Sequence, residues 1–393
     1  MIEIKERRDC CGCNACVQRC PKQCITMQAD NEGFLYPIID ATTCIDCGIC
    51  EKVCPVINQN EPRKPLKVYA AYNKNEQVRM QSSSGGIFTL LAEETIKKGG
   101  VVFGVKFNKD WMPEFDYTET IEGIAPLRGS KYVQAIVGNA YKQAENFLKA
   151  GREVLFCGTP CQIAGLKLYL RKEYNNLLSV DIICHGVPSP GLWNRYLNEK
   201  YQEHCGDNPA DARFKKIESI NFRHKYPLWN DYSFCIKYKG DIPQHRVRAA
   251  KDPYMQAFLL DIVLRPSCYD CPAKGGKSFC DIKICDFWGI EKIMPECDVE
   301  KGIGGVIIYT EKGLEAVSLK DIVKKEYLLD DITRQNPSYY NSCVKPSKRD
   351  FFFKRFDKCD NVVKLLTDST VPSNISKLKK TIKRCLAALK RYI

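Results

Sequence analysis

Short apolar runs and helix-like patterns alternate along the chain from Val68 onward. Runs of about four to eight β-branched and other apolar residues are typical of buried strands, and apolar residues three or four positions apart are typical of helices. Their alternation predicts an α/β core. Strands are expected at 68–72, 100–107, 153–157 and 178–184 and within 221–251, helices at 87–98 and 162–172, and a strand, a turn and a helix start in GGVIIYTEKGLEAV.

Two segments depart from this alternation. The polar sequence NQNEPRKPLK contains two prolines, which predicts a linker over 58–67. Near the end of the chain, apolar residues recur at helical spacing among seven basic residues and no acidic one, at Ile375, Leu378, Ile382, Leu386 and Leu389. This pattern predicts an amphipathic helix that packs on its own domain or meets an acidic protein or a membrane surface.

Composition places the chain among soluble globular proteins. Its 393 residues are 44% hydrophobic and 27% charged, enough for two or three domains with a real core. No charged leader followed by an apolar stretch opens the sequence, and no run reaches the roughly 18 apolar residues of a membrane span. We therefore expect a cytoplasmic protein, whose formal charge of +13 suggests an acidic partner or surface.

Cysteine changes this picture most. Thiols stay reduced in the cytoplasm, so 23 cysteines indicate metal ligation or redox chemistry rather than a disulfide framework. The sequence CCGCNACVQRCP contains C-x2-C-x2-C-x3-C followed by Pro21, and the same pattern returns before Pro55. The two repeats are formed by Cys10, Cys13, Cys16 and Cys20, and by Cys44, Cys47, Cys50 and Cys54.

This spacing is typical of a bacterial two-cluster ferredoxin, which residues 1–57 resemble. Three closely spaced thiolates hold one corner of a 4Fe-4S cluster, and the fourth thiolate of each run reaches the other cluster. One cluster is thus expected on Cys10, Cys13, Cys16 and Cys54, and the other on Cys44, Cys47, Cys50 and Cys20. Structural zinc usually takes two C-x2-C pairs separated by a longer loop, so zinc is disfavoured. Cys11 and Cys24 fall outside the repeat and are interpreted as small buried residues.

A candidate anion site precedes the helix expected at 87–98. The sequence QSSSGGIFTLLAEE places Ser84, Gly85 and Gly86 where free backbone N–H groups and the helix dipole favour an anion. Taken alone, such a sequence is also an ordinary helix start. No G-x-G-x-x-G follows any expected strand, so a Rossmann dinucleotide site has no support.

Several separated motifs lie between about 68 and 356, and they are SSGGIFTLLA, RGSKYVQ, FCGTPCQIAGLKLYL, DIICHGVPSPGLW, RPSCYDCPAK and DIKICDFWGIEK. Together they resemble the family of coenzyme F420 hydrogenase/dehydrogenase beta subunits. With the ferredoxin part, the chain is similar to the two-domain members. The resemblance implies a flavoprotein in which FAD lies beside a further 4Fe-4S cluster.

Carried over by motif, this third cluster would use Cys161, Cys184, Cys268 and Cys271. Sequence proximity offers an alternative, because Cys280 and Cys285 follow closely and could complete a local zinc site with Cys268 and Cys271. The dispersed set is favoured, since each of its members lies inside a family motif. Cys157 would either face the cluster or pack.

The resemblance also assigns the flavin contacts, which are Ser84, Gly85, Gly86, Gly129, Ser130, Lys131 and Tyr132. A cation such as Lys131 near the pyrimidine end of a flavin would stabilise its anionic reduced form; otherwise Lys131 is a solvated surface lysine. The chain departs from the family pattern at Cys285, before Asp286, and at Gly302 to Gly304, where the substrate would then differ.

Two residues are candidates for proton chemistry. His185 follows a proposed ligand and has an unperturbed pKa near neutrality, so it could deliver a proton; a structural role is the alternative. Asp286 is a second candidate acid, with a cap or turn as its alternative role. With Lys131, these form the predicted catalytic set.

The expected architecture is thus α/β (mixed α+β). The expected regions are a ferredoxin-like domain at 1–57, a linker at 58–67, a flavin-binding region at 68–150, a region with the third cluster at 151–345, and a basic tail with the amphipathic helix at 346–393.

The predicted function is an oxidoreductase that passes electrons from ferredoxin, or a similar acidic carrier, through three 4Fe-4S clusters to FAD and a small organic substrate. The alternatives are a non-catalytic electron-transfer subunit of a larger hydrogenase or dehydrogenase complex, and an oxidoreductase that uses coenzyme F420 itself. No nucleic-acid motif accompanies the basic charge, so nucleic-acid binding is not expected.

Overall fold

An eight-stranded mixed sheet forms the centre of the molecule in a computed structural model that describes residues 1–206, 214–295 and 298–371. The strand order is β13-β3-β12-β11-β7-β6-β4-β5. Strands β4, β6, β7 and β11 are mutually parallel, and the outer strands pair antiparallel. The strands are β3 (Lys67–Asn73), β4 (Val101–Phe107), β5 (Pro113–Thr118), β6 (Val154–Gly158), β7 (Leu177–Ile182), β11 (Ile282–Asp286), β12 (Gly304–Ile308) and β13 (Ile322–Glu326).

Helices cover both faces of this sheet because successive strand residues point to opposite faces. Val102 and Leu155 pack with α4, whereas their neighbours Val101 and Val154 pack with α5 and α6. This confirms the predicted α/β class. The helices around this sheet are α3 (Glu76–Gln81), α4 (Ile87–Lys97), η2 (Glu122–Leu127), α5 (Ala140–Lys149), α6 (Pro160–Leu170), η4 (Ile290–Lys292), α10 (Glu311–Ala316), α11 (Leu329–Thr333) and η5 (Pro337–Tyr339).

A second core lies around a three-stranded antiparallel sheet of order β10-β9-β8. Trp193, Phe222 and Tyr254 lie at its centre with ring centroids 5.0 to 6.2 Å apart. Phe352 and Leu366, from the first part of the region expected as a tail, are buried in this core. Its elements are α7 (Pro190–Cys205), β8 (Ile217–His224), β9 (Ser233–Tyr238), β10 (His245–Arg248), α9 (Pro253–Leu259), η3 (Pro266–Asp270), α12 (Ser347–Phe356) and α13 (Val362–Thr370).

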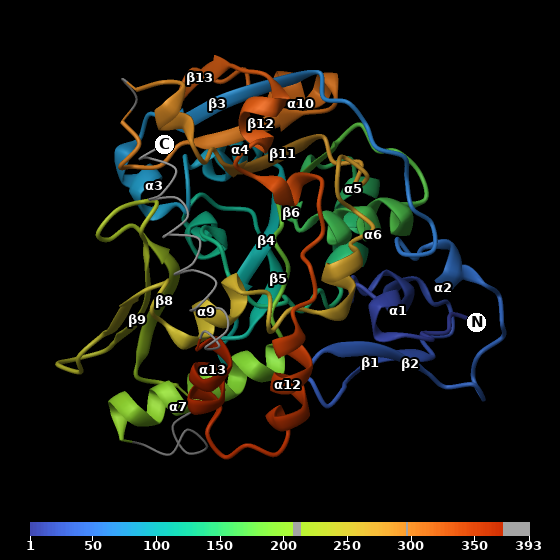
Figure 1. The fold of residues 1–393 in the computed structure, drawn as a ribbon. Helices are drawn as coiled ribbons and strands as arrows, with labels where there is room; N and C mark the ends of the chain where they lie inside the picture. Colours follow the sequence, from blue (N-terminus) through green and yellow to red (C-terminus); the bar gives the residue numbers. More distant parts are fainter. Residues whose placement is uncertain (207–213, 296–297, 372–393) are drawn as a thin grey trace, which may run out of the picture.

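The N-terminal domain is small and packs beside α6 (Figure 1). It contains a β-hairpin in which Ile25 pairs with Ile39, and two short helices that lie within the two cysteine runs. The segment 58–67 does not hang free, because Arg63 Nη2 donates to the carbonyl of Cys280 over 2.6 Å. The domain's elements are η1 (Arg7–Asp9), α1 (Ala15–Arg19), β1 (Ile25–Ala29), β2 (Leu35–Ile39) and α2 (Ile49–Lys52).

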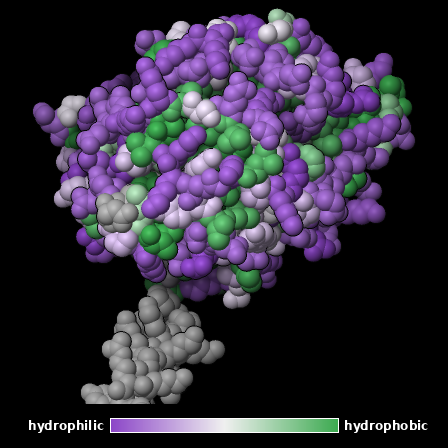
Figure 2. Space-filling model, turned by 90° about the horizontal axis from the view of Figure 1, so that it is seen from above, coloured by the Kyte–Doolittle hydropathy of each residue, from purple (hydrophilic) through white to green (hydrophobic). Residues whose placement is uncertain are grey.

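The surface is mainly hydrophilic on the face that Figure 2 shows, with hydrophobic residues between the polar ones. Among the described helices, none has the length and apolar character needed to cross a bilayer. The amphipathic helix expected over 375–389 lies outside the described residues, as does the greater part of the basic tail.

Candidate iron-sulfur and flavin site

Four thiols from the two cysteine runs line one pocket of the N-terminal domain. Cys10 and Cys13 lie on the loop that leads into α1, Cys16 lies in the first turn of α1, and Cys54 follows α2. Burial, followed by interaction with Cys10 and Cys54, raises the pKa of the Cys16 thiol to about 12. Buried thiols that disfavour one another's charge are compensated when a cationic cluster replaces their protons. The donor set therefore fits the first predicted 4Fe-4S cluster.

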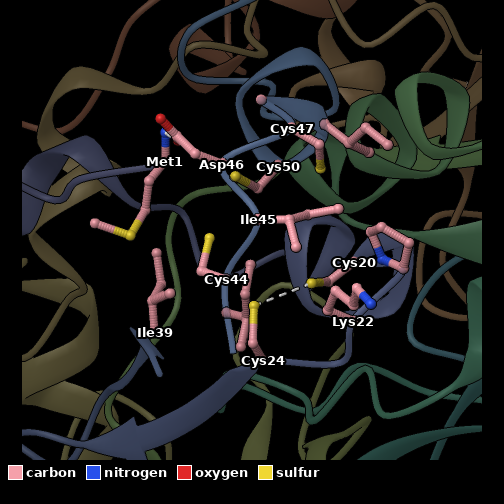
Figure 3. A pocket seen from close by; sticks show the side chains of 14 residues that line it. Met1, Cys20, Lys22, Cys24, Ile39, Cys44, Ile45, Asp46, Cys47 and Cys50 are labelled. Atoms are coloured by element: carbon pink, nitrogen blue, oxygen red, sulfur yellow. Dashed lines mark hydrogen bonds and ion pairs between the residues drawn. The ribbon is translucent and has the colours of Figure 1, made fainter. Parts of the chain in front are cut away.

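A second pocket holds the remaining thiols of the two runs. Figure 3 shows the sulfur atoms of Cys20, Cys24, Cys44, Cys47 and Cys50 around it. Four of these are the predicted ligands of the second cluster. Cys24, to which the sequence gives no role, lies with its Sγ 3.4 Å from that of Cys20. Cys47 is exposed, so this pocket lies nearer to solvent than the first.

A third group of thiols forms at the carboxyl ends of the parallel strands. Cys161 lies in the first turn of α6, where TPCQ forms a capping box in which Thr159 N donates to Gln162 Oε1 over 2.9 Å. Cys184 follows β7, and Cys268 and Cys271 lie in and after η3. Burial, followed by Cys184 and Cys271, raises the pKa of Cys268, and burial, with a smaller contribution from Cys161, raises the pKa of Cys184 to about 12. The four side chains are thus neighbours that fit one cluster.

The cysteines of the alternative zinc site have other neighbours. The thiol of Cys280 donates to Asp181 Oδ1 over 3.2 Å inside a fully buried network, in which Lys283 Nζ lies 2.6 Å from the same oxygen. The thiol of Cys285 faces the carbonyl of Gly305 on β12 at 3.7 Å. These contacts favour the dispersed ligand set over the local zinc site.

Cys11 links the first and third groups of thiols. Its side chain interacts with Cys13 on one side and with Cys161 on the other. On α6, a Cβ at Gly165 would lie 3.0 Å from Cys13 Sγ, so the glycine permits close contact between the helix and the first site. Sequence spacing gave Cys11 no role because its partner Cys161 lies 150 positions further along the chain.

The two segments that the family resemblance assigns to the flavin lie side by side. The backbone N–H of Ser130 donates to Ser83 Oγ over 2.8 Å, which joins 82–86 to 129–132. Nearby, Ser84 Oγ donates to the carbonyl of Ile303, and Trp229 Nε1 donates to that of Ser83. Trp229 in turn stacks on Trp288 at 4.7 Å. The segments are therefore held against the end of β11 and the loop before β12.

The packing and backbone conformation of the chain require glycine at positions 85 and 86. A Cβ at Gly85 would lie 2.4 Å from the carbonyl oxygen of Ala71 on β3 and 2.7 Å from the nitrogen of Gly304 on β12. Gly86 caps α4 with a φ of +80°, a conformation that favours glycine. Gly85 is thus required by the contact with the sheet, independently of any flavin.

Two half-buried amines lie in this region, those of Lys131 and Lys225. Burial lowers the pKa of Lys131 to about 7, and the neighbouring Cys157 opposes this effect. Burial, followed by the charge of Arg79, also lowers the pKa of Lys225 to about 7. The Nζ of Lys225 donates to the carbonyls of Arg79, Ser84 and Lys301. An anionic group beside 82–86, such as a flavin pyrophosphate, would offset the effect that lowers these two pKa values. Cys157 lies beside Lys131, within the core of the sheet.

The remaining catalytic candidates have close partners. Asp286 forms an ion pair of 2.8 Å with the buried Arg223, which also donates to the hydroxyl of Tyr132. His185 Nε2 lies 2.6 Å from Asp261 Oδ1, and its ring packs edge-on against Phe258. Both are therefore held by side-chain interactions. No sequence motif marks Arg223 or Lys225, whose positions depend on the fold.

Family models match three parts of the chain. Residues 9–58 match the model of a 4Fe-4S dicluster domain. Residues 68–141 and 151–332 match the N-terminal and C-terminal models of the coenzyme F420 hydrogenase/dehydrogenase beta subunit. The dicluster match supports 4Fe-4S clusters in the N-terminal domain.

Individual relatives match shorter stretches. An F(420)H(2) dehydrogenase subunit of Methanosarcina mazei is 27% identical over 198 residues, which are 47% of this chain and 55% of the relative. The 7Fe ferredoxin of Hydrogenibacillus schlegelii is 50% identical over 42 residues, which are 11% of this chain and 47% of the relative. The chain thus spans about half the length of these relatives. A structure of the F420-reducing NiFe hydrogenase complex from Methanosarcina barkeri aligns with a TM-score of 0.45 and 17% identity, over 82% of this chain and 93% of the other.

Proposed function

The chain belongs to the family of coenzyme F420 hydrogenase/dehydrogenase beta subunits, and on this premise we propose that it is a cytoplasmic iron-sulfur flavoprotein oxidoreductase. Electrons would pass from ferredoxin, or a similar acidic carrier, through three 4Fe-4S clusters to FAD and on to a small organic substrate. The packing of α6 against the first thiol site carries this proposal, because this helix bears Cys161 of the third site and its Gly165 lies against Cys13 of the first.

The accessibility of the thiols sets the order of the sites. Cys47 is exposed, and the apolar side chains of Met1 and Ile45 beside it are 49% and 58% exposed. An external carrier would therefore meet the second site first. The first site lies inward, against α6, and the third lies at the carboxyl ends of the parallel strands, where ligands bind in such sheets.

The clusters would supply single-electron transfer, and FAD would supply the conversion between single electrons and a hydride. Around FAD, the backbone at 82–86 and 129–132 would bind its polar groups. Lys131, with a pKa near 7, would gain or lose a proton close to the flavin edge as the charge of the flavin changes. Arg223 fixes Asp286 and the hydroxyl of Tyr132. Asp261 orients His185, which is the proposed proton donor near the third site.

A second candidate function is an electron-transfer component of a larger complex that uses coenzyme F420. The name of the Methanosarcina mazei relative, which is an F(420)H(2) dehydrogenase component, favours it. The two functions differ in their electron donor. Reduced ferredoxin and reduced coenzyme F420, offered separately under anaerobic conditions, should bleach the cluster absorbance at very different rates.

Cofactor content tests the proposal. Protein purified anaerobically should contain about twelve iron atoms per chain, as expected for three four-iron clusters. Acid treatment should release FAD, because nothing in the proposed site requires a covalent link, and chromatography distinguishes it from FMN. Iron near eight together with bound zinc would contradict the third cluster. Absence of flavin after incubation with FAD would contradict the flavin site.

A further inference from the structure

Arg265 is a fully buried cation between the N-terminal domain and the third thiol site. Its side chain is 0% exposed. Nε donates to the carbonyl of Cys10 over 2.8 Å, Nη2 to the carbonyl of Leu35 over 2.9 Å, and Nη1 to Gln134 Oε1 over 2.9 Å. The guanidinium also lies 4.2 Å from the ring centroid of Tyr36. Every one of these partners is neutral.

The charge of Arg265 therefore lacks the usual compensation. Arg223 and Arg349, two other buried arginines, pair with Asp286 and Glu32. Within the described part of the chain, the hydrogen bonds of Arg265 reach no carboxylate. A buried, unpaired charge costs several kcal/mol, and an arginine cannot discard its proton to avoid this cost. A negative charge must therefore lie close by.

As thiolate ligands of bound clusters, cysteines of two sites would supply that charge. Arg265 Nε donates to the carbonyl of Cys10, and the backbone N–H of Cys268 donates to the carbonyl of Arg265 over 2.9 Å. Cys10 belongs to the first thiol site and Cys268 to the third. Gly12, at a φ of +71°, permits this approach, because a Cβ there would lie 3.1 Å from the guanidinium carbon and 2.3 Å from Gln134 Nε2. The second pocket contains none of these groups.

We propose that Arg265 is a positioning residue for electron transfer, a cation shared by the first and third clusters that raises the reduction potential of both relative to the second. This inference rests on the proposed function, since it requires both clusters. A cluster held by four thiolates becomes more negative when it accepts an electron, so a fixed cation beside it favours the reduced form. Electrons that arrive at the exposed second cluster are thereby drawn inward.

Redox titration monitored by electron paramagnetic resonance tests this inference. In Arg265→Gln, the reduction potentials of the first and third clusters should fall. The expected change is at least about tenfold in the reduction equilibrium constant, which is about 59 mV for one electron. The potential of the second cluster should not change. Arg265→Lys, which keeps the charge, should keep both potentials close to their wild-type values. Arg195→Gln is the matched control, because Arg195 also donates to backbone carbonyls, those of Phe356 and Cys359.

A second variant covers the case in which Arg265→Gln does not assemble. Gln134→Glu replaces the side-chain amide that accepts from Arg265 Nη1 with a carboxylate. It therefore neutralises the cation while keeping that hydrogen bond. It should lower the same two couples. Unchanged potentials in the assembled variants, or an equal shift of all three couples, would overturn the role of Arg265. Iron measured on the same wild-type sample separates the two hypotheses, since fewer than about twelve atoms would contradict the proposed function instead.

Discussion

Replacing Cys268 with alanine is expected to remove about four of about twelve iron atoms per chain and to leave the N-terminal clusters loaded. The expectation follows from the third thiol site, where Cys268 has Cys184 and Cys271 as neighbours. When one of the four thiolates is removed from a buried site, the cluster is lost. The other three thiolates then lose the cationic cluster that compensates their charge. Iron analysis and the visible absorbance of anaerobic protein measure the effect.

Cys280→Ala is the matched control for this variant. Cys280 is fully buried and is nine positions from Cys271, but its thiol bonds to Asp181. It should leave the iron content unchanged. If Cys268→Ala loses zinc rather than iron, or if Cys280→Ala loses the same metal as Cys268→Ala, the dispersed ligand set is wrong and the local zinc site is supported.

Gly85→Leu is expected to destabilise the whole protein rather than only to release a flavin. Its Cβ would come within 2.7 Å of backbone atoms of both β3 and β12, neither of which can move without opening the sheet. Overpacking against backbone at such a position should cost more than about 3 kcal/mol, a large part of the ~5 to 15 kcal/mol that stabilises a typical domain. Thermal unfolding and the yield of soluble protein report it.

Gly129→Ala is the control from the other flavin segment. Gly129 has a φ of +86°, but an added Cβ would meet no atom within 4 Å. Its cost should be limited to backbone strain of about 1 to 2 kcal/mol. A Gly85→Leu protein as stable as Gly129→Ala would show that the contact with β3 and β12 does not limit this position.

The arrangement of the fold was largely predictable because its signals are local. The apolar runs at 68–72 and 153–157 appear as β3 and β6, and the helix expected at 87–98 ends one residue earlier as α4. The edge strands β5 and β13 were not predicted. Each is only partly buried and carries charged residues, such as Glu114 and Lys324, so neither forms an apolar run.

Predictability of the site declines with distance along the chain. The two cysteine runs are local, and their spacing alone paired Cys54 with the first run and Cys20 with the second, in agreement with the two pockets. The dispersed third set came only from family motifs. Arg265 and Lys225 could not be found by either route, because the surroundings of both side chains are defined only after folding. At Gly85 the structure adds a further reason for glycine, the close approach to the sheet, that the sequence did not reveal.

Single-turnover kinetics test the central claim, that electrons reach the flavin through the third site. Reduced ferredoxin is mixed anaerobically with oxidised wild-type protein or with FAD-loaded Cys268→Ala, and absorbance is followed for the clusters and for the flavin. We predict that the clusters become reduced in both proteins, whereas flavin reduction is fast in the wild type and lost in the variant. Equally fast flavin reduction in the two proteins would contradict this path.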